Sequence, residues 1–373
     1  MPSAGDQSVM SCLPESLGYS QGGDGDSGFL PRPKFRRRIL YVAEAGMYWT
    51  GMGSAYVMAK GVGGAIILTY HSVPPRGSQR WIDPRNSMRP EVFEAQMRFL
   101  SRNRRVVSIN ALVAMIRTER YICPGTVVLT FDDGYRDNLE IVAPILEEYH
   151  FPATLYLATG YVNRAESQWV DRLFTMFRSR TRHSIQVGLP DRGTFDLREP
   201  SACRKAYSLI HDQLLARTHS GREELLGFVK EHLKPEYSAP RLTLTWEEIR
   251  ILRRHYPLFD IGVHTSDHID LTACCGEVAQ LELRRSLEDV ERELGRRADH
   301  FSFPYSRHNR ETRSIVKQFG LCSALASGAD CLINRSSDPY ALPRINPPRS
   351  MSLFRFWTSG AYPGLPIRLL SRA

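Results

Sequence analysis

The sequence lacks the features that would indicate a membrane-spanning, disulfide-rich or low-complexity protein. It has no run of 18 or more apolar residues, which a transmembrane helix would need. Glycine and proline, at 27 and 23 of 373 residues, are ordinary in number, which excludes a collagen-like chain. The 7 cysteines are scattered without a Cys-x-x-Cys, so neither a disulfide framework nor a cysteine zinc site is expected, and reduced thiols in a reducing compartment fit better.

The charge is only mildly unbalanced. Lysine and arginine number 49 and the acidic residues 40, giving a net charge of +9. This excess is compatible with contact to anionic surfaces but does not by itself indicate nucleic acid, and we expect no nucleic-acid partner. The hydrophobic content of 42% excludes a disordered chain, and the length allows one large core or two ordinary ones.

The first 62 residues differ in composition from the rest. Residues 1–28 are rich in Gly, Ser and Asp and predict a disordered tail, without the basic-then-apolar start of a signal peptide. Residues 29–62 predict a basic and apolar helical segment. Its residues 34–60 would either pack against the core or lie on an anionic membrane surface. We therefore expect a cytoplasmic protein, with peripheral contact at the inner membrane as the alternative.

From residue 65 onward, short β-rich runs alternate with helical patterns. Continuously apolar runs predict buried parallel strands at 65–71, 126–131, 153–158, 259–264, 301–305 and 321–326. Helices are predicted at 91–100, 138–149 and 277–294, the last with Gly295 as its C-terminal cap. The alternation predicts one β/α domain over residues 63–350, followed by a C-terminal extension, 351–373. The charged region of about 166–240 predicts a helical insertion.

Three short motifs at the ends of predicted strands carry candidate chemistry. The first, TFDDGY, places Asp132 and Asp133 beside the core, where a metal or a helix dipole would have to neutralise them. The second, HTSDH, places His264 and His268 four residues apart, so that both imidazoles face one point if the segment forms a helical turn. Two histidines and one carboxylate are a common zinc ligand set that leaves a position for water. The third, FSFPY (301–305), suits a rigid turn that presents a backbone N–H and an aromatic wall.

These motifs resemble, in the same order, the first three motifs of the polysaccharide deacetylases (NodB-like, carbohydrate esterase family 4). LTYHSV at 68–73, FEAQMRFL at 93–100, PATLYLATGY at 152–161, WVDRL at 169–173 and LPRI at 342–345 are similar to the branch found in exopolysaccharide clusters. The resemblance covers roughly residues 65–346. It implies an α/β fold, a distorted (β/α) barrel, often seven-stranded, that holds a divalent metal.

The resemblance also implies roles for individual residues. Asp133, His264 and His268 would be the metal ligands, and Asp132 the general base that activates water. Tyr305 would offer its backbone N–H to the oxyanion. Zinc is the expected metal, although cobalt, nickel or iron suits the same donors.

The chain departs from the family pattern at two places. Many members have an arginine where this chain has Ser302, and that arginine orients the catalytic aspartate. Arg344 would replace it from another strand, unless it forms only a surface salt bridge. The late Leu-x-His segment that supplies the general acid is also missing, because neither His300 nor His308 lies in one. His71 would either face the site or be a hydrogen-bonded core histidine.

The substrate side of the site is less constrained by the sequence. Aromatic and polar side chains near the motifs are candidates for lining a sugar cleft, with helix packing as the alternative for Trp169 and Asp171; the expected set is Tyr135, Trp169, Asp171, Pro304 and Tyr305. We expect a metal-dependent hydrolase that removes N-acetyl groups from N-acetylhexosamine units of a poly- or oligosaccharide, free or lipid-linked. The alternatives are an amidohydrolase acting on a small amide, imide or formamide, and a non-catalytic glycan-binding relative.

Overall fold

Seven parallel strands close into a barrel in the computed structural model, which describes residues 64–187, 193–326 and 331–360. Strand β1 pairs with β3 on one side and with β10 on the other, which closes the sheet. The barrel strands are β1 (Ala65–Tyr70), β3 (Thr126–Asp132), β4 (Ala153–Leu157), β7 (Phe259–Val263), β8 (His300–Ser302), β9 (Ser323–Ala326) and β10 (Leu342–Ile345). The short β2 (Arg105–Val106) adds to the start of β3. The expected seven-stranded (β/α) barrel is confirmed.

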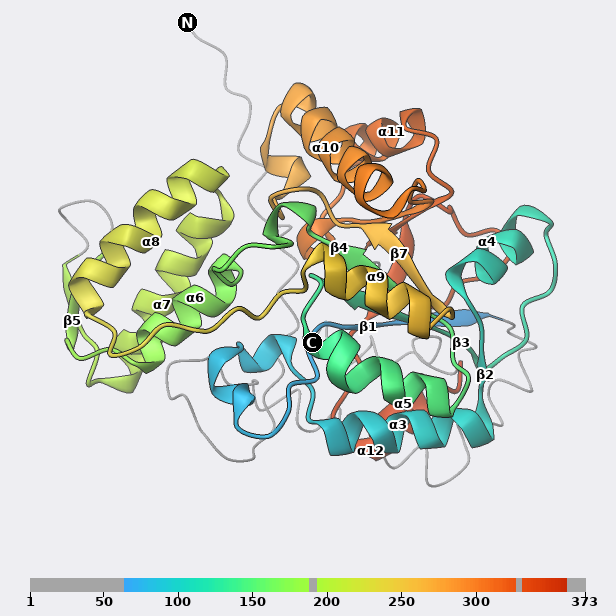
Figure 1. Cartoon of the computed structure of the whole chain (residues 1–373), viewed down its shortest axis with the longest axis horizontal. Coiled ribbons are helices and arrows are strands. Elements are labelled where there is room, and N and C mark those ends of the chain that lie inside the picture. Colours follow the sequence, from blue (N-terminus) through green and yellow to red (C-terminus); the bar gives the residue numbers. More distant parts are fainter. Residues whose placement is uncertain (1–63, 188–192, 327–330, 361–373) are drawn as a thin grey trace, which may run out of the picture.

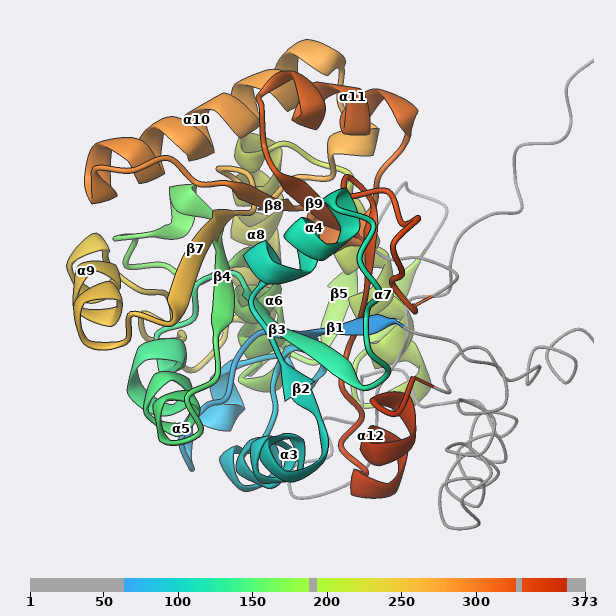
Figure 2. The same ribbon diagram turned by 90° about the vertical axis from the view of Figure 1, so that its right-hand side faces the viewer.

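Helices surround this barrel, as the turned view in Figure 2 shows. The surrounding helices are α3 (Pro90–Asn103), α4 (Ile109–Arg117), α5 (Ala143–Glu148), α9 (Trp246–His255), α10 (Gly276–Leu294), α11 (Arg310–Gln318) and α12 (Met351–Trp357). The expected C-terminal cap of α10 is present, with Gly295 in the left-handed conformation at φ 66°. The helix expected at 138–149 instead begins as a π-helical turn, η3 (Asn138–Val142), before α5.

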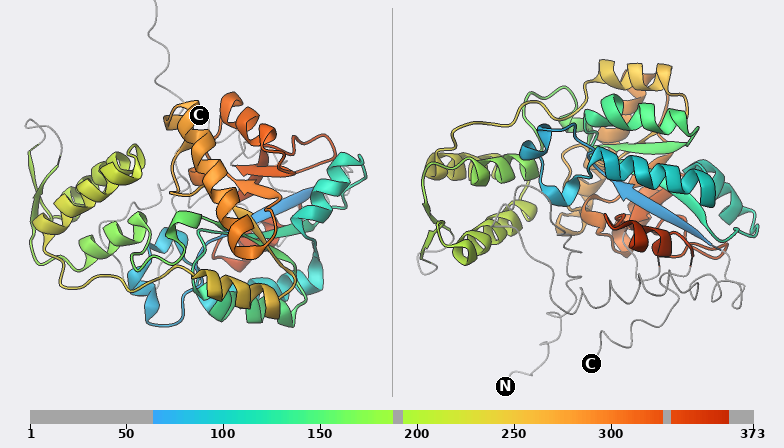
Figure 3. Two further views of the ribbon diagram at one scale, coloured as in Figure 1. Left: turned by 45° about the horizontal axis from the view of Figure 1, so that its top comes forward. Right: turned by 90° about the horizontal axis from the view of Figure 1, so that it is seen from below.

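The chain between α6 and α8 forms a separate lobe beside the barrel (Figures 1 and 3). Its elements are α6 (Trp169–Arg178), the hairpin β5 (Ser184–Gln186) and β6 (Thr194–Asp196), α7 (Pro200–Leu215) and α8 (His219–Leu233). These helices bury a hydrophobic cluster of their own, which includes Phe174, Phe177, Ile210 and Leu226. The hairpin had no signal in the sequence analysis. Within the helical insertion expected at about 166–240, α7 and α8 are separated at Thr218, whose side chain caps α8.

Strand register fixes which side chains point into the barrel. Thr69 of β1 lies opposite Thr130 of β3, and their hydroxyl oxygens are 3.4 Å apart. Because side chains alternate along a strand, the next inward positions are His71 and Asp132, at the carboxyl end of the barrel. Gly262 of β7 is needed one layer below, because a Cβ there would lie 2.6 Å from the Tyr156 ring that fills the interior.

The predicted N-terminal tail (1–28) and the basic segment (29–62) lie outside the described residues, as do 361–373. Membrane contact through residues 34–60 therefore stays a prediction. Among the residues that the structure describes, no helix has the length and apolar character needed to cross a bilayer. Of the expected C-terminal extension, 351–373, the described part forms α12, whose Phe354, Phe356 and Trp357 are buried against the core.

A buried carboxylate ties the end of β1 to the segment that follows β3. Asp137 accepts hydrogen bonds from the Val73 backbone N–H (2.9 Å), from the Ser72 hydroxyl and from the Asn138 amide (3.2 Å). Burial nevertheless raises the pKa of Asp137 to about 7. The folded protein therefore holds a proton on this group between pH 4 and 7, where the unfolded chain has released it.

We predict that wild-type protein loses stability relative to Asp137→Asn as the pH rises from about 4 to 7. The sign follows because the folded state binds the additional proton, so raising the pH through this window favours unfolding. The difference in unfolding free energy between the two proteins should change by no more than about 1.4 kcal/mol per pH unit, and it should level off above pH 7. Urea denaturation of both proteins in a chelator measures it. A pH-independent difference would contradict a raised pKa at Asp137.

Candidate active site and metal centre

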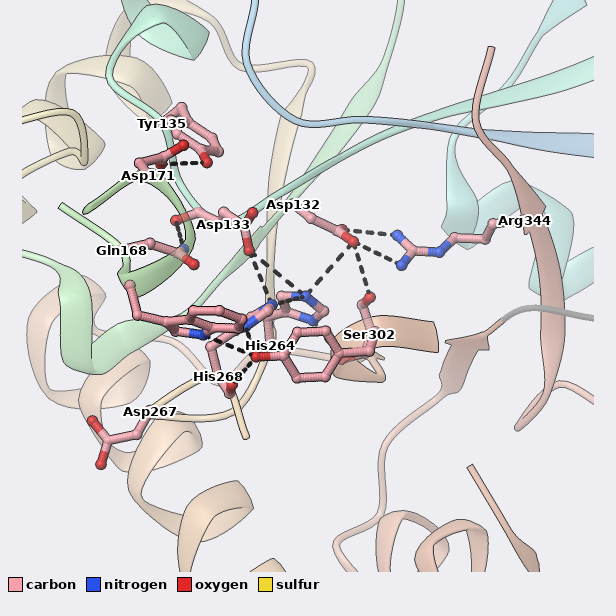
Figure 4. A network of polar contacts seen from close by, with 12 residues as sticks. Asp132, Asp133, Tyr135, Gln168, Asp171, His264, Asp267, His268, Ser302 and Arg344 are labelled. Atoms are coloured by element: carbon pink, nitrogen blue, oxygen red, sulfur yellow. Dashed lines mark hydrogen bonds and ion pairs between the residues drawn. The ribbon is translucent and has the colours of Figure 1, made fainter. Parts of the chain in front are cut away.

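The three sequence motifs meet at the carboxyl end of the barrel (Figure 4). Asp132 is the last residue of β3, and Asp133 follows it at the turn. His264 comes directly after β7, and Ser302 ends β8. The carboxyl ends of parallel strands share one edge, so residues far apart in sequence become neighbours here.

Asp133, His264 and His268 form a buried cluster. Asp133 Oδ1 lies 3.2 Å from His268 Nε2 and 3.8 Å from His264 Nε2. The two Nε2 atoms are 3.2 Å apart. All three side chains are at least nine-tenths buried, and one ligand atom from each lies within 4.8 Å of the others. The expected metal ligands therefore converge on one point.

Hydrogen bonds at the far side of each imidazole fix its protonation. His264 Nδ1 lies 2.7 Å from the Ser302 carbonyl, which can only accept, so Nδ1 carries the proton. His268 Nδ1 donates to the Tyr305 hydroxyl at 3.0 Å, since that hydroxyl uses its own proton to bond the His268 carbonyl at 2.9 Å. Burial lowers the pKa of both histidines, so both are neutral. Both Nε2 lone pairs then face the same point.

Asp133 adds a third acceptor to the two Nε2 atoms, and none of the three faces a hydrogen-bond donor in the part of the chain that the structure describes. Its Oδ1 atom is buried and has no hydrogen-bond partner among the described residues. Burial raises the pKa of Asp133, and the nearby charges of Asp132 and Asp171 raise it further. Two lone pairs and an unsatisfied carboxylate oxygen within 4 Å of one another are unfavourable unless a cation lies between them. The residues present therefore fit a divalent metal.

The histidines converge through a loop, which corrects the helical turn expected between them. Thr265 and His268 both have left-handed backbones, at φ 64° and 49°. The loop is held from outside by the Gly160 N–H, which bonds the Ser266 carbonyl, and by Glu282, which accepts from the Asp267 N–H at 2.8 Å. Such strained conformations persist only where the surroundings impose them, and they concentrate at functional sites.

Asp132 is held by Arg344 of β10 rather than by the residue at motif position 302. Two parallel hydrogen bonds of 2.8 and 2.7 Å join the guanidinium to the carboxylate inside the barrel. The Ser302 hydroxyl lies 3.5 Å from Asp132 Oδ2, a marginal contact. Burial would raise the pKa of Asp132, but Arg344 outweighs it and holds the pKa well below its ordinary value. Arg344 is thus a buried partner of Asp132 and not a surface salt bridge.

His71 lies beside this pair. It follows β1 one residue beyond the Tyr70–Phe131 pairing, level with Asp132, and its pKa responds to Asp132, Arg344 and His264. Burial lowers the pKa of His71 to about 4, so the ring is neutral at pH 7. Among the described residues, no side chain or backbone group hydrogen-bonds the ring nitrogens of His71, which favours the expectation that it faces the site.

The helical lobe supports the metal ligands from behind. Trp169 of α6 donates its indole N–H to the Tyr305 hydroxyl at 3.0 Å. Arg222 of α8 is fully buried and donates to the His268 carbonyl at 3.1 Å, to the Asp267 carbonyl at 3.0 Å and, weakly, to the Tyr305 hydroxyl at 3.4 Å. Tyr305, whose backbone is left-handed at φ 56°, therefore connects the lobe to a metal ligand.

Of the side chains expected to line a sugar cleft, Tyr135, Trp169, Asp171 and Pro304 are buried, and Tyr305 is half-buried. Tyr135 donates its hydroxyl to Asp171 at 2.8 Å, and Asp171 also accepts from the Asp83 N–H. Trp169 and Asp171 have no exposed surface, and Pro304 is buried in its turn. Tyr135 pairs with Asp171, and Trp169 pairs with the Tyr305 hydroxyl, so the helix-packing alternative describes Trp169 and Asp171 better.

Two contributors escaped the sequence analysis. Gln168, just before α6, lies with its amide 3.4 Å from the Asp133 carbonyl. Arg222 occupies the first position of a helical stripe that continues with Leu226, Val229 and Leu233. A charged residue at an apolar position of a stripe is a usable signal of a buried, hydrogen-bonded cation.

Known proteins share both the motifs and the fold. The family model "Polysaccharide deacetylase" matches residues 122–187 and 226–324. YxkH of Bacillus subtilis (strain 168), which carries a provisional polysaccharide deacetylase name, is 30% identical over 92 residues. That match spans 24% of this chain and only 30% of the relative.

Three solved structures have the same fold at low sequence identity. The Streptococcus pyogenes deacetylase PplD is 15% identical, with 79% of this chain and 97% of that chain covered at a TM-score of 0.52. IcaB from Ammonifex degensii is 15% identical, with 80% and 97% covered at 0.53. A de-N-acetylase from Aggregatibacter actinomycetemcomitans is 16% identical, with 78% and 99% covered at 0.50. With its motifs converging at the end of the shared barrel, this chain belongs to the polysaccharide deacetylase family.

Proposed function

We propose that the protein is a metal-dependent hydrolase that removes N-acetyl groups from N-acetylhexosamine units of a poly- or oligosaccharide. One observation supports it above all. An unsatisfied Asp-His-His cluster lies next to Asp132, a second carboxylate that Arg344 keeps ionised. A pure binding site would have no need for an ionised base beside its metal ligands, which disfavours a non-catalytic relative.

Asp133, His264 and His268 would hold the cation, and zinc suits two imidazole nitrogens and one carboxylate oxygen. When bound, a divalent cation supplies Lewis acidity, which polarises an amide carbonyl and makes water more acidic. Asp132 accepts the proton that the attacking water loses. Arg344 orients both carboxylate oxygens and keeps this base ionised in a buried setting. The Tyr305 backbone N–H is the proposed donor to the oxyanion.

The leaving nitrogen needs a proton, and His71 is the proposed carrier. As the carbon–nitrogen bond breaks, the acetyl group leaves with the water oxygen, and the proton taken by Asp132 must reach the amine. His71 lies level with Asp132 and is neutral at pH 7, so it accepts that proton before it donates it to nitrogen. This assignment fills the place of the missing Leu-x-His segment.

The division of labour between base and ligands predicts two different defects. Asp132→Asn should abolish acetate release from N-acetylglucosamine oligomers while zinc content stays near that of the wild type. His264→Ala should lose zinc itself, because a ligand is removed. Zinc is measured by atomic absorption and acetate by an enzyme-coupled assay. Chelation should remove activity and zinc restore it, and equal zinc loss in both variants would refute the assignment.

The proton-carrier role of His71 predicts a dependence on the leaving group. His71→Gln should lower deacetylation of an acetamido sugar by about 10²-fold. Hydrolysis of 4-nitrophenyl acetate should fall far less, because a nitrophenolate leaves without a proton. Zinc content, measured in parallel, is expected to be unchanged. Equal losses on amide and ester would assign His71 to substrate binding or to the fold instead.

Arg222 is proposed as a positioning residue for His268. Its guanidinium bonds the carbonyl of this strained ligand and the hydroxyl that fixes the ligand's tautomer. Outer partners of metal ligands typically contribute about 10- to 100-fold to metal affinity.

Arg222→Met should therefore weaken zinc affinity by about that factor, measured by chelator competition. Arg172→Gln is the matched control, since Arg172 of α6 pairs with Glu223, the neighbour of Arg222 on α8, at 2.6 Å in a partly exposed position. It should leave the zinc affinity near that of the wild type. Equal weakening in both variants would mean that α8 acts only through general stability.

A further inference from the structure

A pocket opens beside His71 at the mouth of the barrel, between the ends of β1 and β10. Three segments line it: the end of β1, the 3-10 turn η2 (Pro84–Asn86) with the residues after it, and the segment between β10 and α12. The wall residues with polar side chains include His71, Ser72, Arg85, Asn86, Ser87 and Arg349. His71 connects this pocket to the candidate active site, because it lies level with Asp132.

The wall lacks the aromatic face that a neutral sugar ring would use. Tyr70 is the aromatic residue among the pocket's lining residues, and it is 3% exposed. Its ring stacks on Phe131 in the core at 5.4 Å, and its hydroxyl donates to Gln96. The other expected platform, Trp169, is buried in the lobe interface. Guanidinium, amide and hydroxyl groups remain to contact a ligand.

The two guanidinium groups of the pocket are not equivalent. Arg85 pairs with the buried Asp83 at 2.6 Å, so its charge is balanced. Arg349 donates through Nη2 to the carbonyls of Pro84 (2.5 Å) and Ser87 (2.8 Å). No carboxylate lies within 4 Å of Arg349 among the described residues. These carbonyl contacts hold Arg349 in place without neutralising its charge.

The surroundings of Arg349 leave its charge in need of a counterion. Burial lowers the pKa of Arg349, and the neighbouring Arg89 lowers it further, while Asp83, already paired with Arg85, acts in the opposite direction. At this end of the pocket, Arg85 and Asp83 balance each other, whereas the charges of Arg349 and Arg89 have no carboxylate of their own among the described residues. A planar, bidentate donor of this kind suits a carboxylate or a phosphate.

We propose that this pocket binds an anionic substituent, a carboxylate or a phosphate, on the part of the substrate next to the acetamido sugar. The inference rests on the proposed deacetylase function and narrows its substrate to an acidic glycan. The carboxylate source is a hexuronate unit in the chain. The phosphate source is a sugar phosphate, as at the reducing end of a lipid-linked oligosaccharide.

Three probes and three variants test this. The probes are a neutral N-acetylglucosamine pentamer, an oligosaccharide of alternating N-acetylglucosamine and glucuronate, and N-acetylglucosamine oligomers with a 1-phosphate. The variants are Arg349→Gln, which retains donors for the two carbonyls but removes the charge, Arg349→Lys, which keeps the charge, and Arg76→Gln, a control at an exposed arginine that pairs with Glu91 outside the pocket. The kcat/KM for acetate release is measured with zinc-loaded protein.

We expect wild type to prefer one anionic probe over the neutral one by about tenfold, the worth of one charge-assisted contact. Arg349→Gln should abolish this preference, mostly through KM, while Arg349→Lys retains part of it and Arg76→Gln retains it fully. The probe whose preference collapses identifies the carboxylate or the phosphate. Equal kcat/KM on all three probes in the wild type would overturn the anionic subsite and leave the deacetylase function standing.

Binding separates the inference from turnover. Calorimetry on zinc-loaded Asp132→Asn, with and without Arg349→Gln, measures the affinity for the same probes without hydrolysis. If an anionic probe binds more tightly than the neutral one, and Arg349→Gln removes this difference, the subsite is supported. It is then supported even if the wild type releases no acetate, because that result would refute only the proposed hydrolase function. Equal affinities for the anionic and neutral probes would overturn the subsite.

Discussion

The buried ion pair between Asp132 and Arg344 is the interaction on which the site depends. Two adjacent carboxylates at the end of one strand would otherwise repel and share protons. Arg344 satisfies both oxygens of Asp132, while Asp133 keeps an oxygen with no partner. The pair thus gives two chemically identical side chains opposite environments, which suit the roles proposed for them, Asp132 as an ionised base and Asp133 as a metal ligand. Opposite environments for neighbouring carboxylates are a common basis for distinct roles in one site.

The tautomer of each imidazole is likewise fixed by a hydrogen bond on the side of the ring that faces away from the cluster. His264 Nδ1 donates a hydrogen bond to the Ser302 carbonyl of β8, and His268 Nδ1 donates one to the Tyr305 hydroxyl. Both Nε2 atoms are therefore left as acceptors. In the proposed metal site, the Nε2 atoms and Asp133 Oδ1 are therefore all acceptors that face one point. The maintenance of this geometry falls to a left-handed loop and to side chains of the helical lobe, which explains why residues outside the motifs are buried there with satisfied hydrogen bonds.

The sequence was sufficient for what depends on local pattern. Apolar runs located the strands that carry Asp132, Asp133 and His264, and the shared carboxyl edge of parallel strands then implied that the motifs meet. The spacing of His264 and His268 correctly predicted that the two imidazoles face one point. The loop between them was not predictable, because tertiary contacts impose the positive φ angles of Thr265 and His268. For Trp169 and Asp171 the sequence left a sugar cleft and helix packing both open, because a polar or aromatic residue near a motif carries no information about its burial. Arg344 was recognisable as a candidate only because the motif position at Ser302 lacks its arginine, and the domain boundaries remain predictions.

Arg222 belongs to the lobe, yet its hydrogen bonds end on the loop that carries His268. The lobe and the barrel are therefore not modules that recombination could exchange freely. A chimera with every motif residue in place but a lobe from another relative would leave the His268 carbonyl and the Tyr305 hydroxyl without a buried donor. Selection on such hybrids would act on the lobe and on the loop between His264 and His268 at once, so these two regions should be inherited together.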